Sequence, residues 1–493
     1  MRNSKPRSGR LPGEAKLEPP LAIPAGDGRD LTEMANARRF AEEHQKVLRY
    51  RASDRNWYVW DERVWQSDKE GSVLRLAQQT VERLWDAVSE LPTGDLHTQG
   101  RRHARHSSSA AGLRAMISLA AADPRVIAPD DGFDAAPHLL NVANGTIDLR
   151  TGQLRPHRSS DLLTRLIEVE YDERATCPRF LQFLDEVLKE DEELQAFLQR
   201  AVGYSLTGET REQVLFFLVG HGGNGKTTLL EVLRALLAPY AAAADMATFL
   251  PSRSDRIRED LFALKSARFV TAVEAGEQTL DEVLLKRISG GDFLRARTLY
   301  RKSQEFRPEF KLWFAMNQLP AIRGTDDGIW RRVRVLPFEA RIAKVDHHLL
   351  EKLQAELPGI LTWAVCGSRD FYEHGLQSPA RVRETVHTYR LENDPVAAFL
   401  QDCCVREPLA KTVAGELYQA YVAWCFETVR PVLSTTAFGR ALNGHGLYGR
   451  KSGSVCWRLG VRPTADPRDE LEVDPWANPA AQRKSIASEP CMR

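Results

Sequence analysis

The sequence of 493 residues lacks the features of membrane and secreted proteins. It has no run of 18 or more apolar residues, so we expect no membrane-spanning helix. Its basic start is followed by proline, glycine and charges rather than by an apolar segment, so we expect no export signal. The seven cysteines form no Cys-x-x-Cys pair, which argues against a zinc ribbon or a disulfide framework and favours a reducing cytoplasm.

The sequence also carries almost no net charge. Lys and Arg number 68 against 67 Asp and Glu, so the composition gives no global sign of nucleic-acid or membrane binding. Any basic binding surface must therefore be local. A chain of this length should fold into two to four domains and has enough apolar residues for at least one large core.

The most informative stretch is 220–227, which reads Gly-His-Gly-Gly-Asn-Gly-Lys-Thr between an apolar run and a helical pattern. This is the P-loop spacing, in which backbone N–H groups and a helix N-terminus bind phosphate. Lys226 would reach the β and γ phosphates of ATP, and Thr227 would bind Mg²⁺. A glycine turn without a ligand is the alternative. The candidate nucleotide-binding residues are Gly220, Gly222, Gly223, Asn224, Gly225, Lys226, Thr227 and Thr228.

A second core strand is predicted at residues 268–273, followed by an acid. A P-loop ATPase needs an acid beside its nucleotide, to hold Mg²⁺ through water and to polarise the attacking water. Glu274 is the first candidate, and Glu277 is the second. Because an acid after an apolar strand is common, the assignment depends on the P-loop 48 residues before Glu274.

A third core strand, 311–317, ends in Asn317, whose amide can orient water or sense the γ-phosphate. Arg331 and Arg332 follow and precede the apolar strand Val333 to Phe338. An arginine at a subunit edge can stabilise charge on the nucleotide bound by a neighbouring protomer. Taken singly, each of the two is more often a surface arginine.

Residues 293–310 predict a β-hairpin with a basic tip. In a ring, such a tip would point into the channel and grip the phosphates of a single strand. The candidate residues are Arg297, Arg301 and Lys302. A solvated hairpin end is the alternative.

The C-terminal third predicts helices at 396–404, 413–426 and 435–443, followed by a short strand pair within 444–459. Three helices and a basic hairpin are typical of a winged helix. Arg440 would lie on its recognition helix, and the wing would carry Arg450, Lys451 and Arg458. A helical lid that only packs on the core is the alternative.

The N-terminal part predicts a helix over Leu31 to Ala52, a small β-hairpin around Trp57 to Trp65 and a helix from about Val73 to Leu91. The basic stretch Gln99 to Ser109 is interpreted as a solvated loop, with a nucleic-acid contact as the alternative. An Asn-Gly turn at Asn144 predicts a further hairpin, and two packed helices are expected between Pro178 and Ser205.

Taken in order, these motifs resemble the superfamily-3 helicases, and more closely the C-terminal helicase part of phage and plasmid primase-helicases, the group related to the poxvirus primase-helicase. The motifs that carry the resemblance are Gly220 to Thr227, the Glu274 strand, Lys286 to Tyr300, Asn317 with Pro320, and Trp330-Arg331-Arg332. Upstream, the stretches similar to the domain before that motor are Asn144 to Gly152, Tyr171-Asp172, Cys177-Pro178 and Gly203 to Gly208. The resemblance covers roughly residues 31 to 460.

The resemblance implies that Lys226 and Thr227 form Walker A, that Glu274 is the Walker B acid and that Asn317 is sensor 1. It makes Arg332 the first candidate for an arginine finger, with Arg331 as the second. It also implies a hexameric ring with ATP between subunits and 3′-to-5′ movement on single-stranded DNA. The family often has two adjacent acids at the Walker B strand, whereas Ala275 follows Glu274 here, so the choice between Glu274 and Glu277 stays open.

A second departure concerns primer synthesis. Primase metal sites commonly use Asp-x-Asp, and this pattern is absent from the sequence. We therefore expect no primase activity from this chain and a separate primase or polymerase as its partner.

The expected fold class is α/β: a P-loop AAA+-like motor with a preceding helical domain and a C-terminal winged-helix domain. The expected divisions are a disordered tail at 1-30, a linker region with a small hairpin and helices at 31-135, a helical domain at 136-210, the P-loop core at 211-345, a helical lid at 346-393, the winged-helix-like domain at 394-462 and a second disordered tail at 463-493.

The expected function is that of an ATP- and Mg²⁺-dependent DNA helicase of phage, prophage or plasmid replication. We expect it to form a homo-hexamer that acts on single-stranded DNA and on replication-fork or origin DNA. We also expect it to be cytoplasmic, without membrane contact. One alternative is an origin-melting or remodelling ATPase without processive unwinding. Another is a sequence-specific DNA-binding replication protein with an inactive motor.

Overall fold

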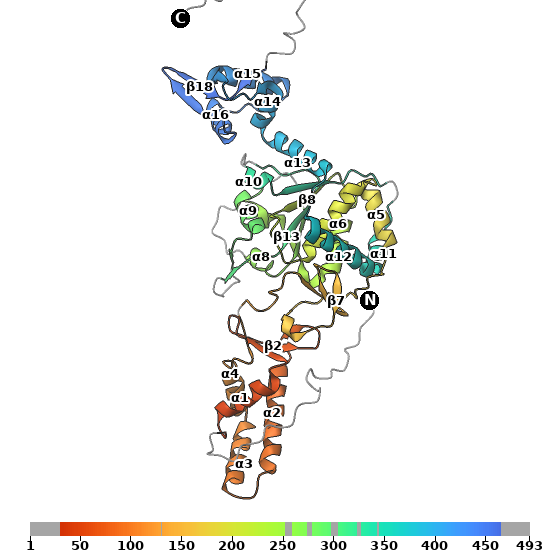
Figure 1. Ribbon diagram of the computed structural model, residues 1–493, viewed down its shortest axis with the longest axis vertical. Coiled ribbons are helices and arrows are strands. Elements are labelled where there is room, and N and C mark those ends of the chain that lie inside the picture. The colour runs from red at the N-terminus through yellow and green to blue at the C-terminus, as the bar shows by residue number, and fades with distance from the viewer. Residues whose placement is uncertain are drawn as a thin grey trace, which may run out of the picture. The chain divides into compact units, whose positions relative to one another are not determined.

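The computed structural model describes residues 30–129, 131–251, 259–273, 279–296, 304–322, 327–342 and 345–464 (Figure 1). The chain divides into two compact units. The first comprises Met1–Gly276, Arg287–Gln318 and Arg334–Val382, and the second comprises Glu277–Lys286, Leu319–Val333 and Arg383–Arg493. Among the helices in the described ranges, none is long and apolar enough to cross a membrane.

The N-terminal part of the first unit combines a four-stranded sheet with four helices. The sheet has the order β3-β2-β1-β4. Its strands are β1 (Leu48–Arg51), β2 (Asn56–Trp60), β3 (Trp65–Ser67) and β4 (Ile127–Ala128). The helices are α1 (Glu33–His44), α2 (Ser72–Ser89), α3 (Asp95–Ser107) and α4 (Ala110–Ala120). Buried apolar residues, among them Phe40, Leu48 and Met116, form the core that joins them.

Two sequence predictions for this region are wrong. The first helix ends at His44, and Tyr50 lies in a strand, because Tyr50 pairs directly with Trp57 across β1 and β2 with ring centroids 5.1 Å apart. The basic stretch expected to be a loop is helix α3. Its small residues Gly100 and Ala104 are buried, and a Cβ on Gly100 would lie 3.1 Å from Val88, so small side chains let α3 pack closely against α2.

A compact three-stranded sheet follows, with β5 (Leu139–Val142), β6 (Gly145–Asp148) and β7 (Gln153–Arg155) in the order β5-β6-β7. The predicted Asn-Gly hairpin is confirmed, because β5 and β6 pair antiparallel on either side of Asn144. A 3-10 turn, η1 (Ser159–Asp161), comes next. The two predicted helices are α5 (Pro178–Leu188) and α6 (Glu192–Leu206).

The first unit is centred on a five-stranded sheet with the order β14-β8-β13-β10-β9 (Figure 1). The pairings of β8 with β13, of β13 with β10 and of β10 with β9 are all parallel. The strands are β8 (Leu215–Val219), β9 (Ala241–Ala244), β10 (Phe269–Val273), β13 (Lys311–Met316) and β14 (Val333–Pro337). The strands predicted at 268–273, 311–317 and 333–338 are thus confirmed, and with them the α/β class of this region.

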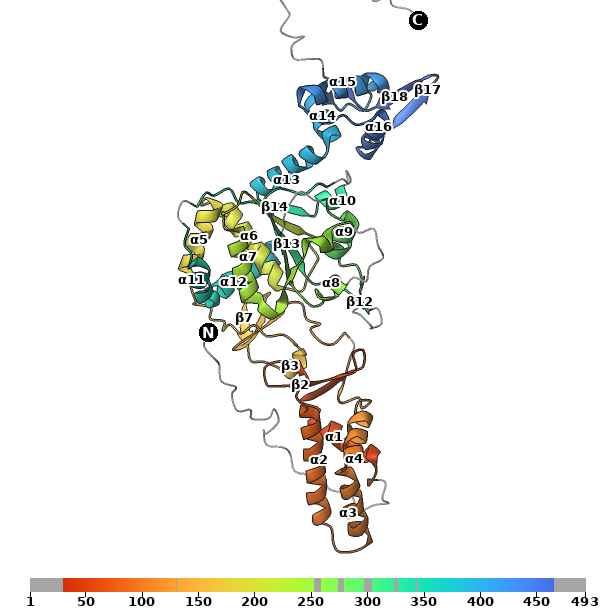
Figure 2. The ribbon, with the colours of Figure 1, turned by 180° about the vertical axis from the view of Figure 1, so that it is seen from behind.

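Successive side chains along each strand point to opposite faces of this sheet, so that each face has its own apolar layer. Phe216 stacks on Trp313 with ring centroids 4.3 Å apart, on the face covered by α5, α6, α7 (Lys226–Leu237) and α12 (Leu357–His374) (Figure 2). Phe217 stacks on Phe314 at 5.1 Å on the other face, where Phe249 packs edge-on against Phe314. Burial of large rings on both faces is what a central strand of a parallel sheet requires.

Apart from α13, the remaining elements are short. They are η2 (Ala238–Tyr240), η3 (Met246–Phe249), α8 (Glu259–Phe262), α9 (Glu282–Gly290), β11 (Leu294–Ala296), β12 (Gln304–Phe306), α10 (Asp327–Trp330), α11 (Leu349–Ala355) and α13 (Ala380–Asn393). β11 and β12 pair antiparallel, as expected for the hairpin at 293–310.

The C-terminal part of the second unit has its own core. Its helices are α14 (Pro395–Cys403), α15 (Ala414–Glu427) and α16 (Thr435–Gly444), close to the three predicted ranges. Its strands are β15 (Cys404–Val405), β16 (Lys411–Val413), β17 (Gly449–Ser452), β18 (Val455–Leu459) and β19 (Arg462–Pro463). β16, β18 and β17 form an antiparallel sheet, and β15 pairs with β19. Buried rings of Phe399, Tyr421 and Phe438 hold the helices together.

Candidate nucleotide-binding site

The glycine loop connects β8, which ends at Val219, to α7, which begins at Lys226. Gly223 and Gly225 have φ angles of 75° and 87°, in the left-handed region that glycine adopts without steric cost. A Cβ on Gly225 would also lie 2.6 Å from Cγ1 of Val187 in α5. The strand, glycine turn and helix expected from the sequence are therefore present, and the turn depends on glycine for its backbone conformation and its packing.

The Lys226 ammonium is held inside this loop. It donates to the carbonyl oxygen of Gly220 at 2.5 Å, to that of His221 at 3.3 Å and to Oδ1 of Asn224 at 2.8 Å. The Asn224 amide in turn donates to the carbonyl of Phe338, which follows β14, at 2.5 Å. Burial lowers the pKa of Lys226. The neighbouring strand thus fixes Asn224, and Asn224 helps to fix the lysine.

The loop lies at the carboxyl edge of the parallel sheet, at a switch in strand order. The chain leaves β8 for the far edge at β9 and returns to β13 beside β8, whereas β14 lies on the other side of β8. Ligands of open α/β sheets bind at such a point, beyond the carboxyl ends of the strands. The register places Met316 beside Val219, and the Gly220 amide approaches the Met316 carbonyl at 3.4 Å.

Asn317 follows Met316 directly and is exposed. The structure therefore brings the predicted sensor residue and the glycine loop to the same edge of the sheet.

The start of α7 offers donors for an anion. Gly225 is its N-cap without a side-chain hydrogen bond, and its first turn contains no acidic residue. The N–H groups at the beginning of a helix have no partner within the helix, and the helix dipole favours negative charge there. Thr227 is exposed in this turn, and Thr228 is half-buried. Backbone donors, a lysine and a hydroxyl in this order fit a phosphate with its Mg²⁺ ion.

Several predicted site residues lie outside the described residues. These are Glu274, Glu277, Arg297, Arg301 and Lys302. Strand β10 ends at Val273, directly before the predicted Walker B acid, and its register with β13 pairs Val273 with Ala315.

The two candidate finger arginines differ in exposure. Arg331 is exposed after the short helix α10. Arg332 is only 8% exposed, and its guanidinium donates to the carbonyl of Gly328. Both belong to the second unit.

The predicted DNA-binding side chains of the C-terminal part are mostly exposed. Arg440 lies on α16, and Arg450 and Lys451 lie on β17, all exposed. Placing Arg458 in the wing was wrong in one respect, since its side chain points inward. Its guanidinium donates to Oδ1 of Asn443 at 2.5 Å and to the backbone of Leu447 at 2.8 Å. Arg458 therefore fastens β18 to α16.

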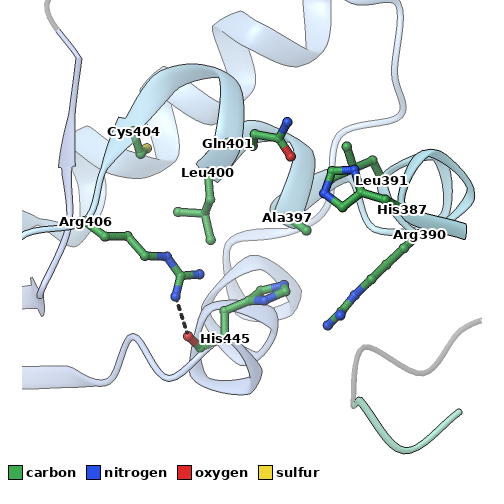
Figure 3. A pocket seen from close by; sticks show the side chains of 9 residues that line it. All are labelled: His387, Arg390, Leu391, Ala397, Leu400, Gln401, Cys404, Arg406 and His445. Carbon is green, nitrogen blue, oxygen red and sulfur yellow. Dashed lines mark hydrogen bonds between the residues drawn. The ribbon is translucent and has the colours of Figure 1, made fainter. Parts of the chain in front are cut away.

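Sequence patterns did not predict a cavity of about 370 Å³ in the C-terminal part of the second unit (Figure 3). Its lining residues are His387, Arg390, Leu391, Ala397, Leu400, Gln401, Cys404, Arg406 and His445. Helical spacing places the first three on one face of α13 and the next three along α14, and Cys404 begins β15. A single sequence gives no signal that these two faces meet.

A second buried lysine lies at the amino end of the same central sheet. Lys311 begins β13, and its ammonium donates to the carbonyls of Thr207, Glu209 and Glu309, the last two at 3.2 Å. Arg268, beside it at the start of β10, donates to the carbonyls of Leu139 and Leu206, both at 2.9 Å. These contacts join the sheet to the segments before it.

Two known families match consecutive parts of the chain. Residues 37–189 match the family described as D5 N terminal like, and residues 218–332 match a family of unknown function, DUF5906. The first match spans α1 to α5, and the second contains the glycine loop, Asn317 and both candidate finger arginines.

Similar proteins of several viruses carry helicase names. The protein named "Putative helicase L207/L206" of Acanthamoeba polyphaga mimivirus is 28% identical over 333 residues, which is 60% of this chain and 34% of that protein. "Putative helicase 121R" of Invertebrate iridescent virus 3 is 28% identical over 224 residues, which is 43% of this chain and 24% of that protein. The chain thus spans about a third or less of the length of these relatives.

Among solved structures, the apo C-terminal region of NrS-1 aligns over 84% of this chain and 96% of that one, with 10% identity and a TM-score of 0.48. The sequence comparisons agree with the resemblance drawn from the motifs: the chain is similar to viral proteins named as putative helicases and, over residues 37–189, to the D5 N terminal like family, which supports a primase-helicase-like protein of the superfamily-3 type.

Proposed function

We propose that this chain is an ATP-dependent DNA helicase whose motor is the P-loop region around Lys226. The observation that carries the proposal is the position of Lys226 inside a glycine loop at the carboxyl edge of a parallel sheet, with Asn317 at the same edge. The helicase names of the viral relatives support the same function. The strand order, with β14 and β13 on either side of the P-loop strand, is in keeping with an AAA+-like motor.

In this proposal the loop N–H groups and Lys226 bind the phosphates of ATP, and Thr227 with Glu274 holds Mg²⁺. The ion would neutralise charge that develops on the phosphate oxygens. Asn317 positions the attacking water, for which Glu274 or Glu277 acts as the base. Lys226 must exchange at least part of its loop contacts for phosphate oxygens, and its carbonyl partners hold its charge in place until then.

The remaining parts of the proposal concern the assembly and DNA. An arginine of one subunit reaches the nucleotide of its neighbour in a homo-hexameric ring, and the exposed Arg331 is better placed for this than the buried Arg332. The hairpin around Arg297, Arg301 and Lys302 contacts one DNA strand in the channel. The C-terminal part acts as a winged helix, with Arg440, Arg450 and Lys451 toward DNA.

Strand separation on a forked duplex tests the helicase proposal. ATP turnover that rises with single-stranded DNA, together with unwinding of the fork, would support it. Turnover without unwinding would favour the origin-melting or remodelling ATPase. Binding at one DNA site without any turnover would favour the DNA-binding protein with an inactive motor. Electron microscopy of the chain with a non-hydrolysable ATP analogue and single-stranded DNA tests the ring.

A further inference from the structure

The cavity in the C-terminal part brings together basic side chains from separate segments. Figure 3 shows Arg390 and His387 from α13 on one side, Arg406 from beyond β15 on the other, and His445 at the end of α16 between them. None of the nine lining residues is acidic. The apolar side chains of Leu391, Ala397 and Leu400 form the rest of the lining. A small, partly apolar space with basic groups on opposite walls fits an anion that carries an apolar portion.

His445 is fixed in this cavity by a buried carboxylate. Its Nε2 lies 2.9 Å from Oδ2 of Asp394, which is only 3% exposed. Burial acts to raise the pKa of Asp394, but hydrogen bonds from His445 and from the backbone of Ala397 outweigh it and lower the pKa. The ionised carboxylate only accepts hydrogen bonds, so the Nε2 of His445 carries a proton. The ring orientation and the tautomer are thereby set.

The two arginines differ in how far their charge is compensated. Arg390 forms an ion pair with Asp327 at 2.7 Å, and the Asp327 carboxylate is 83% exposed. Arg406 forms no ion pair within the residues that the structure describes, and its guanidinium donates to the carbonyl of His445 at 3.4 Å. No ion pair among the described residues therefore compensates the charge of Arg406, and its guanidinium presents N–H donors suited to a planar pair of anionic oxygens.

We propose that this cavity binds a nucleotide, with its phosphate at Arg406 and its sugar or base against His387, Leu391 and Leu400. Two sources share this chemistry: a nucleotide unit of single-stranded DNA and a free nucleoside monophosphate. The DNA source rests on the proposed function. It adds a contact on the connection between α13 and the C-terminal helices, apart from Arg440, Arg450 and Lys451.

The first test is DNA binding by the full chain carrying Arg406→Ala. The probe is a fluorescent oligothymidylate, titrated over a series of salt concentrations. Loss of one phosphate contact should weaken binding and reduce the slope of log affinity against log salt by about one. Arg462→Ala is the matched control. Arg462 is also exposed and lies in β19, where it pairs with Val405 of β15. It differs from Arg406 because it donates to Glu407 at 2.8 Å and does not line the cavity. The control should keep the slope of the unaltered chain.

The second test separates the two sources. Calorimetric titration with thymidine monophosphate uses Lys226→Ala as the background, so that the P-loop does not contribute. Binding of the monophosphate that is lost on adding Arg406→Ala or His387→Ala assigns a free nucleotide to the cavity. If these substitutions weaken binding of the oligonucleotide and leave binding of the monophosphate unchanged, the cavity binds a nucleotide unit of DNA.

Failure of the two proposals can be told apart. If the unaltered chain neither hydrolyses ATP nor binds DNA, the helicase proposal fails, while binding of the monophosphate that depends on Arg406 would still uphold the cavity. If neither probe responds to Arg406→Ala or His387→Ala in folded protein, the cavity assignment is wrong whatever the motor does. Thermal melting of each variant checks that it is folded.

Discussion

Two buried lysines lie at opposite ends of the central sheet, and each donates to three oxygen atoms, most of them backbone carbonyls. Lys226, at the carboxyl end, donates to two backbone carbonyls and one amide oxygen. Lys311, at the amino end, donates to three backbone carbonyls and lies 4.8 Å from the ring centre of Tyr204. Both are nearly inaccessible, with 5% and 2% of their surface exposed. The number of hydrogen bonds does not distinguish them.

Their surroundings do distinguish them. The oxygens around Lys226 belong to a loop whose outer residues Gly222 and Gly223 have open space where a Cβ would stand. The oxygens around Lys311 belong to the end of α6, the turn after it and the start of β13. Burial lowers the pKa of both ammonium groups, and that of Lys311 falls well below its usual value. A lysine in an open loop can exchange its partners for phosphate, whereas an enclosed one can only hold the fold together.

Lys226→Ala should give the largest effect. Without the ammonium, charge on the transferred phosphate loses its main side-chain donor, so ATP turnover should fall by about 100-fold or more. The thermal midpoint should change little, because the loop oxygens can turn to water. Steady-state phosphate release and a melting curve measure the two quantities. Lys352→Ala is the control, because Lys352 is an exposed lysine paired with Asp346. Turnover that persists in Lys226→Ala would contradict the assignment of the site.

Lys311→Met should lower stability and leave ATP turnover nearly unchanged, the reverse of Lys226→Ala. It keeps most of the side-chain volume but leaves the carbonyls of Thr207, Glu209 and Glu309 without their donor, which should cost about 1–3 kcal/mol of unfolding free energy. Turnover per folded molecule should remain, since Lys311 is at the opposite end of β13 from Asn317. Denaturant unfolding and active-site titration measure the two effects. A loss of turnover with unchanged stability would show that the comparison is wrong.

Two glycines sharpen the comparison within the loop itself. Gly225→Ala forces an alanine into the left-handed region and puts its Cβ 2.6 Å from Val187, so it should cost about 1–3 kcal/mol and weaken nucleotide binding. Gly222→Ala meets open space and should stay within about 0.5 kcal/mol of the unaltered chain. Melting and binding of a fluorescent ATP analogue provide the readouts. Equal effects of the two substitutions would mean that loop openness does not decide tolerance.

The loop was predictable from sequence because its chemistry is local. Eight consecutive residues supply the turn, the lysine and the helix start, so spacing alone indicates their geometry. The same holds for the Asn-Gly turn at Asn144 and for the aromatic core strands. Lys311, by contrast, is one lysine at the beginning of an apolar strand, and two of its three partners, the carbonyls of Thr207 and Glu209, lie about a hundred residues earlier.

The errors have the same origin. Tyr50 continues the helical spacing of apolar residues in the sequence, but it pairs with Trp57 in the structure and therefore lies in a strand. The arginines of 101–105 suggested a solvated loop, whereas Gly100 and Ala104 pack against α2 and make a helix. The cavity in Figure 3 needs faces of α13, α14 and the end of α16 to meet. Contacts between distant segments decide each of these cases, and a pattern in one segment does not contain them.

The last prediction concerns the pH dependence of stability. In the unfolded chain Lys311 binds its proton up to its ordinary pKa of 10.5, and in the folded chain it releases the proton at a lower pH because of burial. Between these two values the unfolded state holds more protons, so the unfolding free energy rises with pH, by at most about 1.4 kcal/mol per pH unit. Below the folded pKa both states are protonated and the cost of the buried charge is fully present. Denaturant unfolding from neutral to alkaline pH should show this rise relative to Lys311→Met. Parallel curves for the two proteins would mean that Lys311 keeps its proton throughout this range, and that its enclosed surroundings do not lower its pKa.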